Sequence, residues 1–425
     1  MSMATNKQKQ NMKRRVAAQK NLPGGNQGSS AADREPMNSI SIGAGEEPSS
    51  LSVGTGEQAA GASRSGGLER PLQFSARSEF LKVLHRRVDE YFVKTGRHAR
   101  DCPSMYVKTG VILLWLAASY VSLILTVSTP WLAVPLAISL GLAMAAVGFN
   151  IQHDGNHRAY SDRTWVNRMM ALTLDMLGGS SYVWSRKHNS IHHTYTNIPG
   201  HDDDIDLGHL ARLAPGQKHF GFHRLQHFYL WALYGFTAFK WQVFDDFFNV
   251  FVGRIGRHHL VRPRGWDLFV FLVGKVFFFS FAFVIPIVLC GFVPVLVFYS
   301  VATFVQGVTL SVVFQLAHCV ENAEFPQPKE GSDVIENDWA VHQVETTVDF
   351  ARENKVVAWY VGGLNFQVEH HLFPRICHIH YPELSKIVEQ TCGEFGIQYR
   401  VHQTFSSGVA SHFNWLRRMG RPEAA

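Results

Sequence analysis

The most constraining feature of the sequence is a long stretch, from Thr109 to Gln152, that contains no charged residue. Ser128, Thr129 and Pro130 divide it into two apolar segments, Gly110 to Val127 and Trp131 to Phe149. A helix needs about 20 predominantly apolar residues to cross about 30 Å of hydrocarbon. The two segments are therefore predicted to form a transmembrane helical hairpin.

A second pair of apolar segments, Leu268 to Leu289 and Val295 to Ala317, is interrupted by Cys290, Gly291 and Pro294. It predicts a second hairpin. Lys275 lies within the first of these segments, where a charge is costly, and we expect it to snorkel or to pair with a carboxylate. The expected fold class is an all-α integral membrane protein with four transmembrane helices in two hairpins and a cytosolic helical cap.

Two hairpins return the chain to the same side of the membrane each time. Four arginines immediately before the second hairpin mark that side as cytosolic by the positive-inside rule: Arg254, Arg257, Arg262 and Arg264. Between the hairpins, Met169 to Val183 and Phe228 to Val252 are apolar but carry charges, which favours helices that lie in the membrane interface. We expect a multi-pass protein of a bacterial inner membrane or the endoplasmic reticulum, with both termini in the cytosol.

The first part of the chain has a different composition. Residues 1–75 are rich in Gly, Ser, Ala, Asn and Gln and predict a disordered N-terminal tail, which leaves residues 76–425 as the membrane domain. The basic start is not followed by an apolar core, so that no signal peptide is expected. The five cysteines show no CxxC spacing and therefore predict neither a zinc ribbon nor an iron–sulfur site. We expect membrane lipid, and no nucleic acid, as a partner.

Three histidine clusters lie in polar stretches beside the apolar segments. They are HDGNH at His153 to His157, HNSIHH at His188 to His193, and QVEHH at Gln367 to His371. Histidines four positions apart share one face of an α-helix, so that each of the first two clusters can direct two imidazoles at one centre. One such pair is a weak signal, whereas three clusters in one chain indicate a metal site.

The same residues resemble the three histidine boxes of the membrane fatty acid desaturases, most closely the front-end type, which insert a double bond between an existing one and the carboxyl end. The resemblance extends over Trp184 to Asn197, Gly200 to Asp206 and Gly362 to Pro374. Gln367 stands where the wider family has a histidine, a variant typical of the front-end group. Many eukaryotic members carry a fused cytochrome b5 domain, and no such domain is expected here.

The resemblance implies that His318, at the end of the fourth apolar segment, also binds metal. It gives eight candidate ligands: His153, His157, His188, His192, His193, His318, His370 and His371. Eight ligands can hold two ions at four each. Imidazole suits zinc and iron alike. The resemblance implies two non-haem iron ions with O2 as co-substrate, which agrees with the need for a redox-active metal to oxidise an unactivated methylene.

An all-histidine centre needs polar groups that orient the imidazole N–H groups and offset the positive charge. Four residues beside the boxes are candidates for this role: Asp154, Asp204, Gln367 and Glu369. Gln367 is expected to hydrogen-bond to a water or a neighbouring imidazole rather than to ligate metal. Histidines outside the boxes, among them His223, His342, His378 and His380, are expected mostly on the surface.

The resemblance implies O2-dependent desaturation of an unsaturated acyl chain, carried by coenzyme A or by a lipid. A separate electron donor is then required, either ferredoxin or cytochrome b5 with its reductase. The nearest alternative is a fatty acid hydroxylase or sphingolipid desaturase on the same scaffold. A more distant alternative is a histidine-rich metal transporter, which would place its ligands at mid-membrane rather than beside the spans.

Overall fold

Four long apolar helices form the part of the chain that is suited to cross a membrane. They comprise α3 (Pro103–Thr126), a second span over Pro130–Asn156, a third over Trp266–Cys290, and α15 (Phe292–His318). The expectation of four membrane helices is confirmed. The computed structural model describes residues 72–76, 78–328 and 331–422, and these lie within one unit of the chain.

Two of the spans contain a π-helical turn. The second consists of α4 (Pro130–Val147), the π-helix η1 (Gly148–Gln152) and α5 (His153–Asn156), so that it continues without a break into the first histidine box. The third consists of α13 (Trp266–Phe279), the π-helix η6 (Ser280–Val284) and α14 (Ile285–Cys290). Gly291, at φ 84°, makes the turn between α14 and α15 in a conformation that favours glycine.

α4 is the central helix of the membrane part, because it packs along both α3 and α15. A Cβ atom at Gly141 of α4 would collide with the backbone oxygen of Ala302 on α15. Small residues allow such close approach of membrane helices. The first hairpin and the last span are thereby joined along their length.

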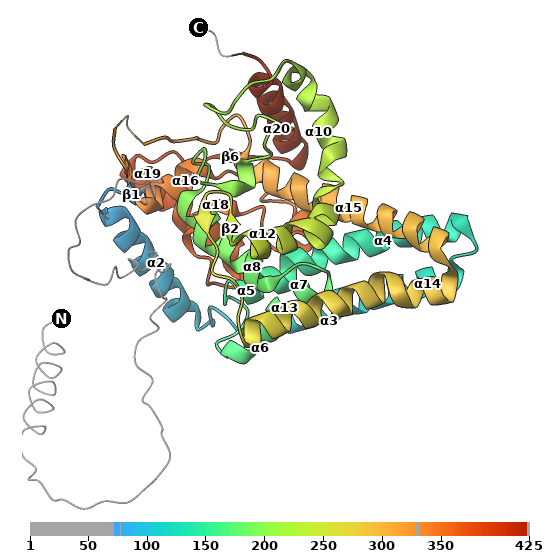
Figure 1. The fold of residues 1–425 in the computed structure, drawn as a ribbon. Coiled ribbons are helices and arrows are strands. Elements are labelled where there is room, and N and C mark those ends of the chain that lie inside the picture. Colours follow the sequence, from blue (N-terminus) through green and yellow to red (C-terminus); the bar gives the residue numbers. More distant parts are fainter. Residues whose placement is uncertain (1–71, 77, 329–330, 423–425) are drawn as a thin grey trace, which may run out of the picture. The chain divides into compact units, whose positions relative to one another are not determined.

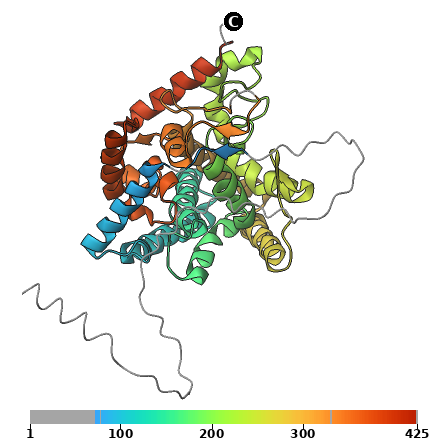
Figure 2. The ribbon, with the colours of Figure 1, turned by 90° about the vertical axis from the view of Figure 1, so that its left-hand side faces the viewer.

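The remaining helices gather at one end of the four spans (Figure 1). α2 (Glu79–Thr95), drawn in blue in Figure 2, packs on α19 (Tyr381–Phe395) through a buried apolar stripe of Phe80, Leu84, Val88 and Phe92. The other cap elements are α6 (Thr164–Ala171), α7 (Thr173–Met176), α8 (Ser181–Trp184), η2 (Ser185–His192), α9 (His193–Tyr195), η3 (Asp203–Ile205), η4 (Gly221–Leu225), α10 (Gln226–Tyr234), α11 (Thr237–Lys240), η5 (Trp241–Asp245), α12 (Asp246–Val252), α16 (Trp339–Thr346), α17 (Lys355–Tyr360), α18 (Gln367–Leu372), η7 (His378–His380) and α20 (Phe405–Met419).

Strands are confined to three two-residue pairs within the described ranges. They are parallel β1 (Gln73–Phe74) with β4 (Val334–Ile335), antiparallel β2 (Arg254–Ile255) with β3 (His258–His259), and parallel β5 (Asp349–Phe350) with β6 (Val401–His402). Most of the tail expected over residues 1–75 lies outside the described residues. Its last residues include β1, which pairs with the segment before α16.

The buried charge in the third span has a partner. Lys275 Nζ lies 2.8 Å from Asp246 Oδ2 of α12, and both side chains are buried. The same ammonium donates to the backbone oxygens of Gly178 and Gln242. The expected pairing with a carboxylate is confirmed, and it links the third span to α12 of the cap.

Candidate metal centre

The eight histidines implied as ligands come from four separate parts of the fold. His153 and His157 belong to α5 and its C-terminal end, and His318 is the last residue of α15. His188 and His192 lie in η2 and His193 begins α9, whereas His370 and His371 lie in α18. All eight side chains are at most 8% exposed. Segments more than 200 residues apart in the sequence are thus brought together at the cap end of the spans.

The second histidine box does not form the α-helix that was expected from the spacing of its histidines. η2 is a π-helix, in which the rings of His188 and His192 are stacked with centroids 5.2 Å apart. π-Helical turns are rare and occur frequently at functional sites. The wider turn directs His188 and His192 to two different groups of histidines.

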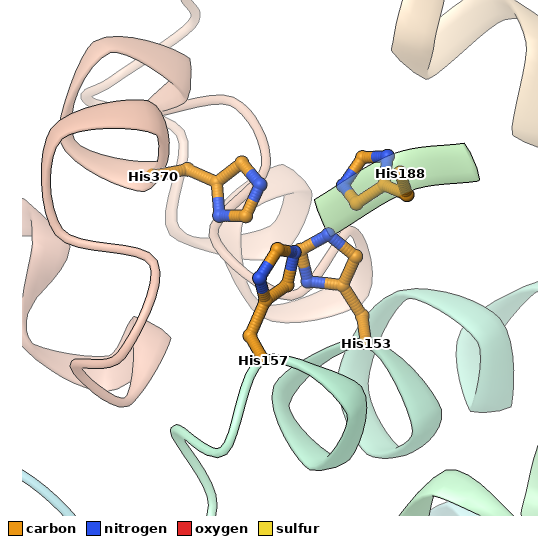
Figure 3. A group of neighbouring side chains, drawn as sticks. All are labelled: His153, His157, His188 and His370. Atoms are coloured by element: carbon orange, nitrogen blue, oxygen red, sulfur yellow. The ribbon is translucent and has the colours of Figure 1, made fainter. Parts of the chain in front are cut away.

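One group consists of His153, His157, His188 and His370, whose rings converge on a common space in Figure 3. One nitrogen from each lies within 4.8 Å of the others. Trp184 covers one side of this group, because its ring stacks on His188 at a centroid distance of 4.3 Å. Four imidazoles at this separation are suited to hold one metal ion.

A second group consists of His192, His318 and His371, again with one nitrogen from each within 4.8 Å. His193 lies between the two groups. Its Nε2 is 3.2 Å from His188 Nε2, and its ring stacks on that of His371 at 4.2 Å. His193 also groups with His370 and His371, so that the eight imidazoles form one continuous cluster.

Buried nitrogens without partners provide a test of whether this cluster fits metal. Six of the eight candidate ligands have such a nitrogen: Nε2 of His157, His192, His370 and His371, and Nδ1 of His193 and His318. A buried polar atom that makes no hydrogen bond costs about 1–3 kcal/mol. Coordination of a metal ion would satisfy these atoms, so that the residues present fit a metal centre.

The electrostatic state of most of these rings also suits metal binding. Burial, followed by repulsion from the neighbouring imidazoles, holds the pKa of His188, His193 and His371 well below the usual value. These rings are therefore neutral, which is the form that binds metal. Burial would lower the pKa of His192 as well, but the buried Asp202 carboxylate raises it above the usual value.

The outer nitrogens of three histidines contact other side chains. His192 Nδ1 donates to Asp202 Oδ2 at 3.0 Å, and His371 Nδ1 donates to Gln343 Oε1 at 2.7 Å. His370 Nδ1 lies 3.4 Å from the Tyr381 hydroxyl. In all three rings the inner Nε2 is the nitrogen without a partner. Such outer contacts fix the tautomer and the orientation of a metal-binding imidazole.

Two of these outer residues were missed by the sequence argument. Gln343 accepts a second hydrogen bond from Thr196 Oγ1 at 3.0 Å and so joins the segment that follows the second box to the third box. Neither Gln343 nor Tyr381 belongs to a histidine box, and no spacing in the sequence indicates them. Asp202 belongs to the acidic cluster after the second box, but the sequence does not distinguish it from its neighbours.

The four residues that the sequence predicted to contact the candidate metal-binding histidines differ in what they actually contact. Gln367 Nε2 lies 2.9 Å from His318 Nε2, as expected for an amide that contacts an imidazole. Asp204 Oδ2 is 3.9 Å from His192 Nδ1, and its other oxygen pairs with Lys187 at 2.9 Å. Asp154 accepts from His378 Nδ1 at 2.9 Å, and Glu369 accepts from the Tyr399 hydroxyl at 2.9 Å. Only Gln367 directly contacts a candidate ligand at hydrogen-bond distance.

The surface location expected for the other histidines was wrong for His223, His342, His378 and His380, which are all buried. His378 lies between Asp154 and Lys108, whose Nζ is 2.9 Å from His378 Nε2. His380 Nε2 lies 2.9 Å from the backbone oxygen of His98, and His223 Nε2 lies 2.9 Å from that of His209. Contacts distant in the sequence compensate for burial of His378 and His380, and spacing alone does not show them.

Comparison with known proteins agrees with this geometry. The family model described as fatty acid desaturase matches residues 129–403. The chain is 42% identical over 342 residues to an sn-1 linoleoyl-lipid 6-desaturase of Arthrospira platensis, covering 80% of this chain and 92% of that protein. It is 40% identical to the protein of the same name from Synechocystis sp., covering 82% of this chain and 98% of that protein. An acyl-lipid (8-3)-desaturase of Physcomitrium patens is 35% identical, covering 81% of this chain and 72% of that protein.

Proposed function

The chain belongs to the fatty acid desaturase family, and we propose that it desaturates an acyl chain of a membrane lipid between an existing double bond and the carboxyl end. Relatives at 40% and 42% identity carry names that specify a linoleoyl-lipid and position 6. The observation that carries the proposal is the buried cluster of eight histidines, six of which have a buried nitrogen without a hydrogen-bond partner. The proposed substrate is therefore a linoleoyl-type chain bound to lipid.

We propose that two iron ions would be held by the cluster, one by each of the two histidine groups, with His193 lying between the groups. When bound, iron at such sites supplies the redox chemistry for reduction of O2 and oxidation of an unactivated carbon chain. The balanced reaction takes a –CH2–CH2– unit, O2, two electrons and two protons to –CH=CH– and two molecules of water. Each of the two hydrogens leaves the acyl chain as a proton and an electron.

The residues of the protein orient the imidazoles, exclude water and position the acyl chain, so that one carbon–carbon bond is oxidised. Asp202 and Gln343 hold the outer nitrogens of His192 and His371, so that their Nε2 atoms point inward. The near-complete burial of the eight rings excludes bulk water from the centre. Position of the acyl carbons relative to this fixed cluster would decide which bond is oxidised, because reactivity depends strongly on orientation.

The proposed function also requires an electron donor and an orientation in the membrane. The two electrons come from a separate carrier, ferredoxin or cytochrome b5 with its reductase. The histidine cluster and both termini face the cytosol, at a bacterial inner membrane or the endoplasmic reticulum. The arginines before the third span support this orientation by the positive-inside rule.

A hydroxylase or a sphingolipid desaturase on the same scaffold remains the nearest alternative, and product analysis separates the three. The chain would be expressed in a host that lacks polyunsaturated lipids, with linoleate supplied, and fatty acids of each lipid class would be analysed by gas chromatography and mass spectrometry. We expect a new double bond at position 6 in lipid-bound linoleoyl chains and none with His192→Ala. A hydroxylated product, or desaturation of long-chain bases alone, would contradict the proposal.

A further inference from the structure

An apolar groove lies between the two membrane hairpins. Residues of α3 in the first hairpin and of α13, η6 and α14 in the second form two of its walls, and residues of α4, α7 and α15 complete the lining. Figure 1 shows where these helices lie. The groove has a volume of about 460 Å³ and extends from Leu177 of the cap to Cys290 at the far turn. We call it the hairpin groove. It is separate from the histidine cluster, since none of the eight rings lines it.

The lining of the groove restricts what it can bind. Five of its side chains carry polar groups, and each already makes a hydrogen bond within the protein. Tyr120 donates to the backbone oxygen of Phe281, and Tyr299 donates to Gln242 Oε1. The same holds for the remaining three: Thr173, Cys290 and Thr303. The lining therefore offers an occupant no free hydrogen-bond donor and is otherwise apolar, so that hydrocarbon is the chemistry that fits best.

Water is a poor occupant because the lining is almost entirely apolar and offers no free donor, and apolar cavities remain dry. An empty groove would deprive its lining of van der Waals contacts. The groove lies among the membrane spans, where the surrounding solvent consists of lipid acyl chains. A lipid acyl chain is thus the occupant that the surroundings supply and the lining accepts.

The position of the groove relates this occupant to the histidine cluster. Val147 of α4 lines the groove, and His153 follows it by six residues in the same continuous span. Six residues correspond to at most about 9 Å along a helix. The cap end of the groove is therefore separated from the first histidine box by no more than this distance along the span. The two chains of a glycerolipid begin at similar depths, because both are attached to one glycerol.

We propose that the hairpin groove binds one acyl chain of a diacyl glycerolipid while the other chain of the same molecule reaches the histidine cluster. The inference rests on the proposed function and deepens it, since it makes a lipid with two chains the preferred substrate. Acyl-coenzyme A and lysolipids carry only one acyl chain. With these substrates the groove would be filled by other lipids of the membrane. The affinity comes from packing rather than from exclusion of water, because membrane hydrocarbon surrounds the groove already.

The test compares two groove variants from opposite walls, Ala117→Phe and Ala282→Phe, with Ala118→Phe. Ala117 and Ala282 line the groove, whereas the neighbouring Ala118 is exposed and does not. Purified protein, reconstituted with reductase and ferredoxin, would be given diacyl lipid or lysolipid that carries the same linoleoyl chain. Iron content and co-purified lipid would be measured on the same samples by elemental analysis and native mass spectrometry.

We expect both groove variants to lose co-purified diacyl lipid and to show roughly tenfold lower kcat/KM for the diacyl substrate, as loss of about ten carbon–carbon contacts implies. Turnover of lysolipid and iron content should be unchanged, and Ala118→Phe should match the wild type. Unchanged diacyl turnover and bound lipid would overturn the inference, and so would an equal loss for both substrates. If the proposed function itself were wrong, the iron-loaded wild type would desaturate neither substrate. This outcome differs from the outcomes that would overturn the groove alone.

Discussion

At the scale of single residues, Gln343 provides the clearest prediction. Its Oε1 accepts from His371 Nδ1 at 2.7 Å in a buried environment. Gln343→Leu removes the acceptor, and we expect metal affinity to fall by roughly 10 to 100-fold, the range of outer contacts to metal-binding histidines. Gln343→Glu keeps an acceptor and should retain most of the metal. Chelator titration followed by elemental analysis measures this, with the exposed Gln398→Leu as control. Equal metal affinity in Gln343→Leu would show that the contact does not position His371.

Gln367 gives a second prediction at this scale. Its side chain lies 2.9 Å from His318 Nε2, and the Nδ1 of His318 has no partner. Gln367→His places a ring against His318 in place of the amide, so that the orientation of His318 changes. We expect iron to be retained and product formation to fall by about 10 to 100-fold. Product and iron are measured on the same preparation. Full activity would instead identify position 367 as an interchangeable ligand.

Some residues of the candidate metal centre can be predicted from the sequence and others cannot. The seven histidines of the boxes stand out by spacing, and the resemblance adds His318. Gln343 and Tyr381 are not predictable in this way, because each meets its imidazole through tertiary packing between α18 and another helix. Asp202 could be predicted only in part. Its acidic cluster is visible in the sequence, but the turn at η3 decides which carboxylate faces His192.

At the scale of the helices, the pair of Lys275 and Asp246 links the third span to α12. Burial raises the pKa of Asp246 to about 6, although Lys275 opposes this shift. Lys275→Met leaves Asp246 buried without its partner, and we expect unfolding free energy to fall by about 3–5 kcal/mol. The double variant Lys275→Met with Asp246→Leu removes both charges and should recover most of this loss. Thermal or denaturant unfolding in detergent measures the cycle. Equal losses in the single and double variants would contradict the interaction.

The helices differ in how well the sequence predicts them. The spans follow from length and hydropathy, which is why the expected Val295 to Ala317 falls within the observed Phe292–His318. The π-helices η1 and η2 could not be predicted. η1 contains no histidine, and the spacing of four between His188 and His192 in η2 suits an α-helix equally well. In η2 the wider turn distributes His188 and His192 between two groups.

At the scale of the whole molecule, the proposed topology of four membrane crossings would place all histidine boxes on one side of the membrane. Single cysteines tested with a membrane-impermeant label report this arrangement. Arg163, Lys218 and Asp333 are exposed positions of the cap, and Ser128 is exposed at the turn between the first two spans. We expect Arg163→Cys, Lys218→Cys and Asp333→Cys to be labelled from the cytosolic side alone, and Ser128→Cys from the opposite side alone. The unaltered chain controls for its own thiols, of which Cys290 is partly exposed. A cap position labelled from the same side as Ser128 would mean that the chain crosses the membrane differently, and the histidines could not then share one aqueous face.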